Sequence, residues 1–197
     1  MKLEADEPTS STELVAGARP WPRSVVALHW IGAAMVISML LLGTIMTRAD
    51  IDAGQKFDLY QLHKSVGFAL LAVTALRIAI RSRTRRPAWP SNMSNWEIRI
   101  ARAAHVLLYA LLLTLPLIGW VTVSAAPIPV PTHAFGLVEI PHLTGANREL
   151  YELARTAHRV AAWLLAGLVV LHVLAALEHH FWSRDETLLR MLAQRRD

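Results

Sequence analysis

The sequence contains no cysteine among its 197 residues. Without thiols the chain cannot form disulfides, ligate an iron–sulfur cluster, use a thiol nucleophile or attach a haem covalently through Cys-x-x-Cys-His. Any redox group must therefore be held by other side chains. The sequence offers nine histidines for such a role.

Carboxylates are absent from four long apolar segments, at about 25–46, 62–80, 106–126 and 160–177. Each segment is close to the roughly 20 residues that a helix needs to cross the hydrocarbon core of a bilayer. None shows the regular polar face of a soluble helix. The sequence therefore predicts an all-α membrane protein, an up-down-up-down bundle of four transmembrane helices. We place the spans at about 24–46, 60–81, 104–125 and 157–180.

Basic residues are concentrated between the second and third spans, where Glu97 is the one opposing carboxylate. The cations there are Arg81, Arg83, Arg85, Arg86, Arg99 and Arg102. Because cytoplasmic loops are enriched in Lys and Arg, this loop and both termini are expected to be cytoplasmic. The net charge of +5 thus indicates topology, and we expect no nucleic-acid partner. We predict a disordered polar tail at 1–18, a membrane domain at 19–182 and a short basic tail at 183–197.

Four histidines fall at matching depths of the predicted bundle. His158 and His172 lie fourteen positions apart in the fourth span, which places them on nearly the same face with a rise of about 21 Å. Helix direction brings His29 level with His172 on the inner side, and His63 level with His158 on the outer side. Two pairs of imidazoles at two depths predict bis-histidine ligation of two haems.

Other residues near these depths have two interpretations each. Arg77 lies fourteen positions after His63 and is a candidate partner for haem propionates, or a side chain that reaches the inner headgroups. His179 is a candidate ligand for a propionate or a quinone carbonyl, or a solvated interfacial residue. Gly43 and Gly67 provide room for a macrocycle or for close helix packing. His105 is a weaker candidate near the inner site.

Two rival classes of protein fit the sequence less well. Zinc and di-iron sites gather several ligands in one sphere, often with carboxylates, whereas these pairs are widely separated in spans without carboxylates. A transporter without a cofactor would need a polar path or broken helices, which the spans do not supply.

Several motifs resemble the bacterial cytochrome b-561 family, over roughly residues 19 to 191. They are Leu28-His29-Trp30, Leu62-His63-Lys64-Ser65-Val66-Gly67, the stretch from His105 to Pro116-Leu117-Ile118-Gly119, and the run from Leu171-His172 through His179-His180 to Met191. The resemblance implies a multi-pass protein of the bacterial inner membrane with two haems b. It assigns His29 and His172 to the inner haem and His63 and His158 to the outer haem, with no metal held except through haem iron.

The resemblance also implies ubiquinone as an electron partner. The closing segment resembles that of members which oxidise superoxide, so superoxide is the donor that we expect on the outer side. Lys64, Arg155 and Arg159 are candidates to attract that anion, or ordinary interfacial anchors. The polar extension before Arg19 and the loop from Pro127 to Gly145 depart from the family pattern.

The leading hypothesis is therefore an oxidoreductase of the superoxide:ubiquinone type, acting in the lipid bilayer without an obligate protein partner. The alternative is a cytochrome b anchor subunit, which relays electrons from a hydrogenase or dehydrogenase to quinone. An electron-transfer protein with no catalytic activity of its own also fits the pattern. The sequence indicates no separate catalytic side chain.

Overall fold

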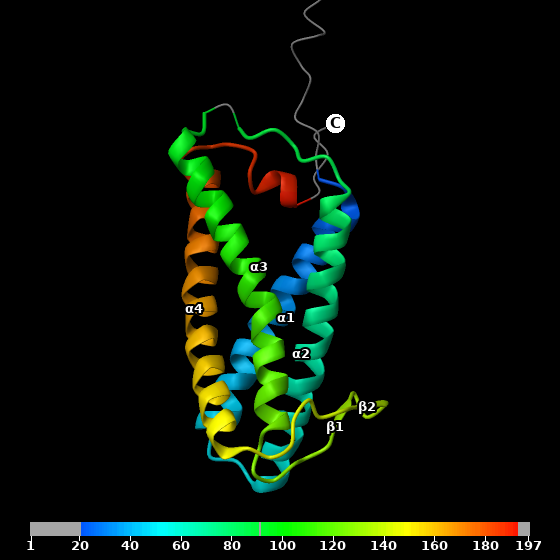
Figure 1. Ribbon diagram of the computed structural model, residues 1–197. Coiled ribbons are helices and arrows are strands. Elements are labelled where there is room, and N and C mark those ends of the chain that lie inside the picture. The colour runs from blue at the N-terminus through cyan, green and yellow to red at the C-terminus, as the bar shows by residue number, and fades with distance from the viewer. Residues whose placement is uncertain (1–20, 91, 193–197) are drawn as a thin grey trace, which may run out of the picture.

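Four long helices make up most of the protein, which is described here by a computed structural model that covers residues 21–90 and 92–192. They are α1 (Arg23–Arg48), α2 (Ala53–Ser82), α3 (Asn95–Ser124) and α4 (Arg148–Phe181). Each is long and apolar enough to cross a membrane. The helices run up and down in sequence (Figure 1), so the predicted four-helix membrane bundle is confirmed. The predicted tail at 1–18 lies outside the described residues.

The helices extend several residues beyond the predicted spans because polar residues cap them outside the apolar segments. Asp52 accepts hydrogen bonds from the backbone nitrogens of Gly54 and Gln55 at 2.8 and 3.0 Å. Ser94 and Glu97 form a reciprocal capping box at the start of α3. Asn147 accepts from the Leu150 nitrogen at 3.0 Å and starts α4. α4 therefore begins at Arg148, well before the predicted start of the fourth span at about 157.

Large apolar side chains cover the outside of the bundle, where a soluble protein would carry charge. The exposed fraction is 59% for Leu41, 70% for Val106 and 64% for Leu171. Surfaces of this kind face the hydrocarbon of a bilayer. The central cluster of buried side chains takes one residue from each helix, namely Val36, Leu70, Leu115 and Leu165.

This cluster forms a layer at mid-height. Leu165 lies seven residues from both His158 and His172, or about 10 Å along the helix from each. The backbones of α1 and α2, of α2 and α3, and of α3 and α4 pack closely, whereas those of α1 and α4 hardly approach each other in the described chain.

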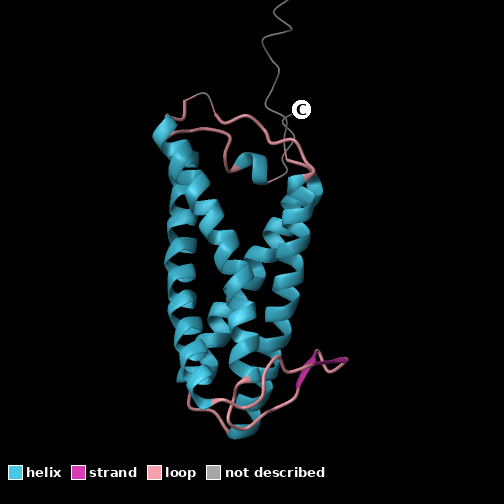
Figure 2. Ribbon diagram, viewed as in Figure 1, coloured by secondary structure: helices cyan, strands magenta, loops and turns pink. Residues whose placement is uncertain are grey.

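The two ends of the bundle differ. At one end, which we call the terminal end, the described chain begins at Trp21 and finishes at Leu192; residues 183–192 fold back there and include a short 3-10 helix, η1 (Leu189–Met191). At the other, the hairpin end, β1 (Thr132–Ala134) pairs antiparallel with β2 (Val138–Ile140). Figure 2 shows this hairpin reaching sideways from the bundle. The sequence did not predict the hairpin.

Candidate functional site

His29 on α1 and His172 on α4 face each other toward the terminal end of the bundle. Their ring centres are 6.3 Å apart, and the ring planes are inclined by 74°. His105 on α3 approaches the same site, with its ring 5.5 Å from that of His172. The His105 Nδ1 donates to the Ala101 carbonyl at 2.6 Å, so the Nε2 nitrogen is left to act as an acceptor.

His63 on α2 and His158 on α4 repeat this arrangement toward the hairpin end. Their ring centres are also 6.3 Å apart, with the planes inclined by 68°. The His158 Nδ1 donates to the Leu115 carbonyl of α3 at 3.2 Å. A hydrogen bond of this kind fixes the tautomer and leaves Nε2 free to bind a metal.

The spacing of both pairs fits two axial ligands on one iron. An imidazole nitrogen lies about 2.0 Å from a first-row metal and roughly 1.1 Å from its own ring centre, so two rings that bind one metal from opposite sides would have centres about 6.2 Å apart, close to the observed 6.3 Å. No three or more His, Asp or Glu residues gather as a metal site in the described chain. Two ligands at each depth suit a metal whose other ligands come from a macrocycle.

Unsatisfied ring nitrogens point the same way. The Nδ1 atoms of His29 and His63 are buried and have no hydrogen-bond partner within the described part of the chain. A buried polar atom without a partner is costly. Ligation of a metal through such a nitrogen would remove this cost, so the residues present fit a haem.

The site at the hairpin end adjoins a cavity to which all four helices contribute. His63 and His158 line it together with apolar side chains that include Met39, Leu112 and Ala162. Such a lining suits the flat apolar face of a macrocycle and excludes water.

Glycines lie close to the imidazoles at this end. A Cβ at Gly43 would lie 3.6 Å from the His63 Cε1, and a Cβ at Gly119 would lie 3.3 Å from the His158 Cε1. The space at Gly43 is consistent with its predicted place beside the outer pair. A Cβ at Gly67 would lie 3.4 Å from the Met39 Cε, and Met39 lines the same cavity, so both interpretations of Gly67 stay predictions. The role of Gly119 was missed, although it ends one of the motifs that resemble the family.

Two arginines lie close to the pair at the terminal end. The buried Arg77 Nε has no hydrogen-bond partner among the residues that the structure describes, and the guanidinium lies 5.5 Å from the Tyr109 ring centre. Arg81 donates to the Tyr109 hydroxyl at 3.0 Å and lies over the Trp21 ring at 5.3 Å. Within the described residues no carboxylate forms an ion pair with either arginine. The site thus carries positive charge that an anionic group could balance. Sequence reasoning found Arg77 and missed Arg81 and Tyr109 as its neighbours.

His179 lies seven residues after His172 on α4 and contacts the folded-back segment 183–192. Its Nδ1 is 2.6 Å from the Asp185 Oδ2, and the Thr187 nitrogen donates to the Asp185 Oδ1 at 2.8 Å. Burial raises the pKa of Asp185, but the hydrogen bonds from Thr187 and His179 outweigh it and lower that pKa below its ordinary value. The carboxylate therefore stays ionised and fixes the orientation of the imidazole.

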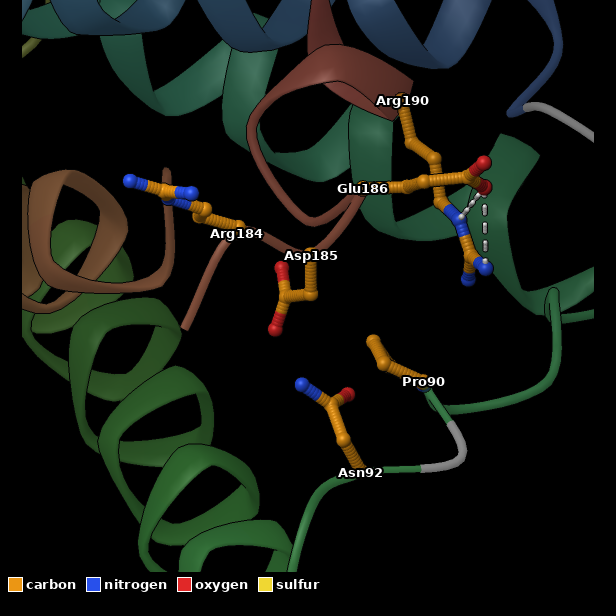
Figure 3. A pocket seen from close by; sticks show the side chains of 6 residues that line it. All are labelled: Pro90, Asn92, Arg184, Asp185, Glu186 and Arg190. Atoms are coloured by element: carbon orange, nitrogen blue, oxygen red, sulfur yellow. Dashed lines mark hydrogen bonds and ion pairs between the residues drawn. The ribbon is translucent and has the colours of Figure 1, made fainter. Parts of the chain in front are cut away.

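A polar cavity of about 300 Å³ lies beside this segment at the terminal end. Figure 3 shows the Asp185 carboxylate pointing toward Asn92, with the Glu186–Arg190 ion pair to one side. Arg184 and Pro90 complete the lining. No member of the two imidazole pairs lines this cavity.

Of the three cations expected to attract an anion on the outer side, two already make other interactions. Arg155 lies 3.7 Å from Glu152, and the Lys64 Nζ donates to the Pro131 carbonyl at 3.4 Å. Arg159 is exposed. His133 and His142 are exposed as well and do not join either pair.

The structure so far describes a membrane-spanning helical bundle with two opposed imidazole pairs at two depths. Comparison with known proteins identifies its family. Residues 20–194 match the family model described as prokaryotic cytochrome b561. The chain belongs to this family, and it is a multi-pass bacterial membrane protein of electron transfer whose membership implies haem b.

Curated relatives agree with this assignment. The chain is 31% identical over 168 residues to "Cytochrome b561 homolog 2" of Escherichia coli, covering 85% of this chain and 88% of the relative. It is 30% identical over 171 residues to "Probable superoxide oxidase CybB" of Yersinia pestis, covering 87% and 94%. A third relative, "Cytochrome b562" of Cereibacter sphaeroides, is 28% identical over 89% of this chain and 96% of its own length.

Proposed function

We propose that the protein holds two haems b and passes electrons between a donor at the hairpin end and ubiquinone at the terminal end. The observation that carries this proposal is the repeated 6.3 Å spacing of His29 with His172 and of His63 with His158. Haem iron supplies one-electron redox chemistry. The remaining roles belong to the protein, which orients the imidazoles, balances charge and controls access.

At the terminal end, Arg77 and Arg81 are placed to bind the propionates of the inner haem. Both cations lack a carboxylate partner in the described residues, and arginine binds carboxylates with well-defined geometry. Tyr109 orients the Arg81 guanidinium through the hydrogen bond at 3.0 Å. We assign the terminal end to the cytoplasm, because the Arg-rich connection between α2 and α3 lies there.

His179 is the candidate for ubiquinone at the same end. Because the His179 Nδ1 is paired with Asp185 at 2.6 Å, Nε2 is the ring nitrogen left for a quinone, and it donates to a quinone carbonyl when the imidazole carries a proton on both nitrogens. Reduction of a quinone to a quinol takes two electrons and two protons, and an imidazole that is hydrogen-bonded to a carboxylate is suited to transfer a proton. The other candidate role for His179 is to bind a propionate.

At the hairpin end, superoxide is the donor that we propose. One relative carries the name of a superoxide oxidase. Superoxide is an anion, and Lys64 and Arg159 on α2 and α4 flank His63 and His158 in the sequence. Two superoxide ions would give up one electron each and leave as O₂, while one ubiquinone takes up both electrons and two protons.

A stopped-flow and steady-state assay on the purified protein tests this function. Superoxide generated by xanthine oxidase should reduce the haems, and addition of ubiquinone-1 should reoxidise them while accelerating superoxide loss. The His158→Ala variant should lose this acceleration. Haems that dithionite reduces but superoxide does not would contradict the proposed donor.

The alternative function, an anchor subunit that relays electrons from a hydrogenase or dehydrogenase, makes a different prediction. Mild solubilisation would then yield a stoichiometric iron–sulfur partner protein bound to the chain. The proposed stand-alone oxidoreductase should instead purify without such a partner and keep its quinone-dependent activity.

A further inference from the structure

The turn of the β-hairpin is apolar and exposed. The exposed fraction is 57% for Phe135, 85% for Leu137 and 59% for Val138, and residues 134–138 include no charged side chain. Phe135 and Gly136 both have positive φ, at 51° and 73°, so the backbone turns sharply and presents the apolar side chains at its tip. An exposed apolar cluster at the edge of a soluble domain would call for a partner.

Hydrogen bonds fix the depth of this turn relative to the membrane. The Phe135 nitrogen donates to the Ser65 Oγ at 2.9 Å, and the Gln61 Nε2 donates to the Pro131 carbonyl at 3.1 Å. Ser65 is 3% exposed and lies at the start of the apolar part of α2. The hairpin is thus attached to α2 at the boundary of the hydrocarbon core, not at the tip of the helix.

The lengths of the helix and the bilayer support this depth. α2 has 30 residues and is about 45 Å long, whereas the hydrocarbon core is about 30 Å thick. The polar start of α2, with Gln55, Lys56 and Asp58, must therefore project into the headgroups and water. Trp120, an aromatic of the kind enriched at membrane interfaces, donates to the Pro141 carbonyl at 2.9 Å and holds the return strand at the same level.

The direction of the hairpin also favours contact with lipid. Figures 1 and 2 show it extending sideways from α2, away from the bundle. Its apolar tip therefore continues the apolar surface of the membrane-spanning helices. We infer that the Phe135–Val138 turn inserts into the adjacent leaflet, with lipid as its occupant, and anchors the hairpin end of α2 beside His63. The inference does not depend on the proposed redox function.

The absence of cysteine allows a direct test. Single Leu137→Cys and Val138→Cys variants, labelled with a nitroxide and reconstituted into phosphatidylcholine vesicles, can be compared with Gly145→Cys in the same loop. A Cβ at Gly145 has nothing within 4 Å. Continuous-wave power saturation measures the access of oxygen, which concentrates in lipid, and of a water-soluble nickel chelate.

Labels at 137 and 138 should be relaxed more strongly by oxygen, and the label at 145 more strongly by nickel. A nickel response at 137 and 138 equal to that at 145 would show that the turn is in water and overturn the inference. Low access to both reagents would show burial by a protein partner. Spin–spin broadening that disappears on dilution with unlabelled protein would show a second copy. Either of these last two results would also overturn it.

Discussion

The two imidazole pairs share a ring separation of 6.3 Å and nearly perpendicular planes, but they lie in different surroundings. Around His63 and His158 the neighbours are apolar side chains and glycines. Around His29 and His172 they are arginines, a tyrosine and a third histidine. One bundle thus holds the same pair of imidazoles in an apolar site at one end and in a cationic site at the other.

Under the proposed function, this difference would give the two haems separate properties. Reduction of a haem removes one positive charge, so neighbouring cations favour the reduced form and raise its potential. At the hairpin end the potential of the proposed haem would depend instead on desolvation and on the Leu115 carbonyl, which accepts from His158. We therefore expect the two sites to respond to different substitutions.

The largest effect should follow loss of an axial ligand. His63→Ala and His29→Ala should each lower the content from two haems to one per chain, because a single axial imidazole leaves the iron without its opposite ligand. Pyridine haemochromogen quantitation of the purified variants measures this content. His142→Ala, in the exposed part of the loop, is the matched control and should retain both haems.

A substitution that removes space should affect the hairpin end alone. In Gly119→Leu the new side chain would meet the His158 ring, since a Cβ there already lies 3.3 Å from Cε1. We expect loss of most of the outer haem. Gly167→Leu is the control, because a Cβ at Gly167 meets nothing within 4 Å. Equal haem contents in the two variants would contradict the assignment of Gly119 to the outer site.

Removal of a cation should affect the terminal end alone. In Arg77→Gln the midpoint potential of the inner haem should fall by several tens of millivolts, on the order of 1–2 kcal/mol for one electron. Potentiometric titration followed in the visible spectrum separates the two haems. Arg48→Gln, at the opposite end of α1, should leave the inner potential unchanged, and an equal shift in both haems would argue against a local effect.

The smallest effect should come from the folded-back segment. Asp185→Asn weakens the hydrogen bond to His179, and we expect the Tm to fall by about 2–4 °C. Because the pKa of Asp185 is lowered in the folded state, its stabilisation is present above the ordinary value of 3.8 and is lost as the pH falls through the lower folded value. Glu186→Gln, which removes the exposed carboxylate of the ion pair with Arg190, should change the Tm less.

The sequence predicted the fold and the pairing of the histidines because both follow from regular helices. Apolar length defines a span, and a spacing of fourteen residues returns to one helix face. The structure brings His29 to His172 and His63 to His158 as predicted, while their role as haem ligands stays a prediction. Arg77 lies near the inner pair, as helix direction required.

Features that depend on lateral packing or on loop folding could not be predicted in this way. The contact of Arg81 with Tyr109 needs the rotation of α3 against α2, which depends on their mutual packing. The hairpin is held by a hydrogen bond from the Phe135 nitrogen to the Ser65 Oγ. A single serine within an apolar helix gives no sign in the sequence that it binds a loop. The pairing of His179 with Asp185 depends on a tail that reverses direction at Arg184, where φ is 50°.

The most direct test of the whole account is the haem-to-chain ratio of the unmodified protein, measured by pyridine haemochromogen and by quantitative amino-acid analysis. The account predicts two b-type haems per chain. A ratio of one would leave one imidazole pair without its proposed function, and a colourless protein would contradict the redox role of both pairs.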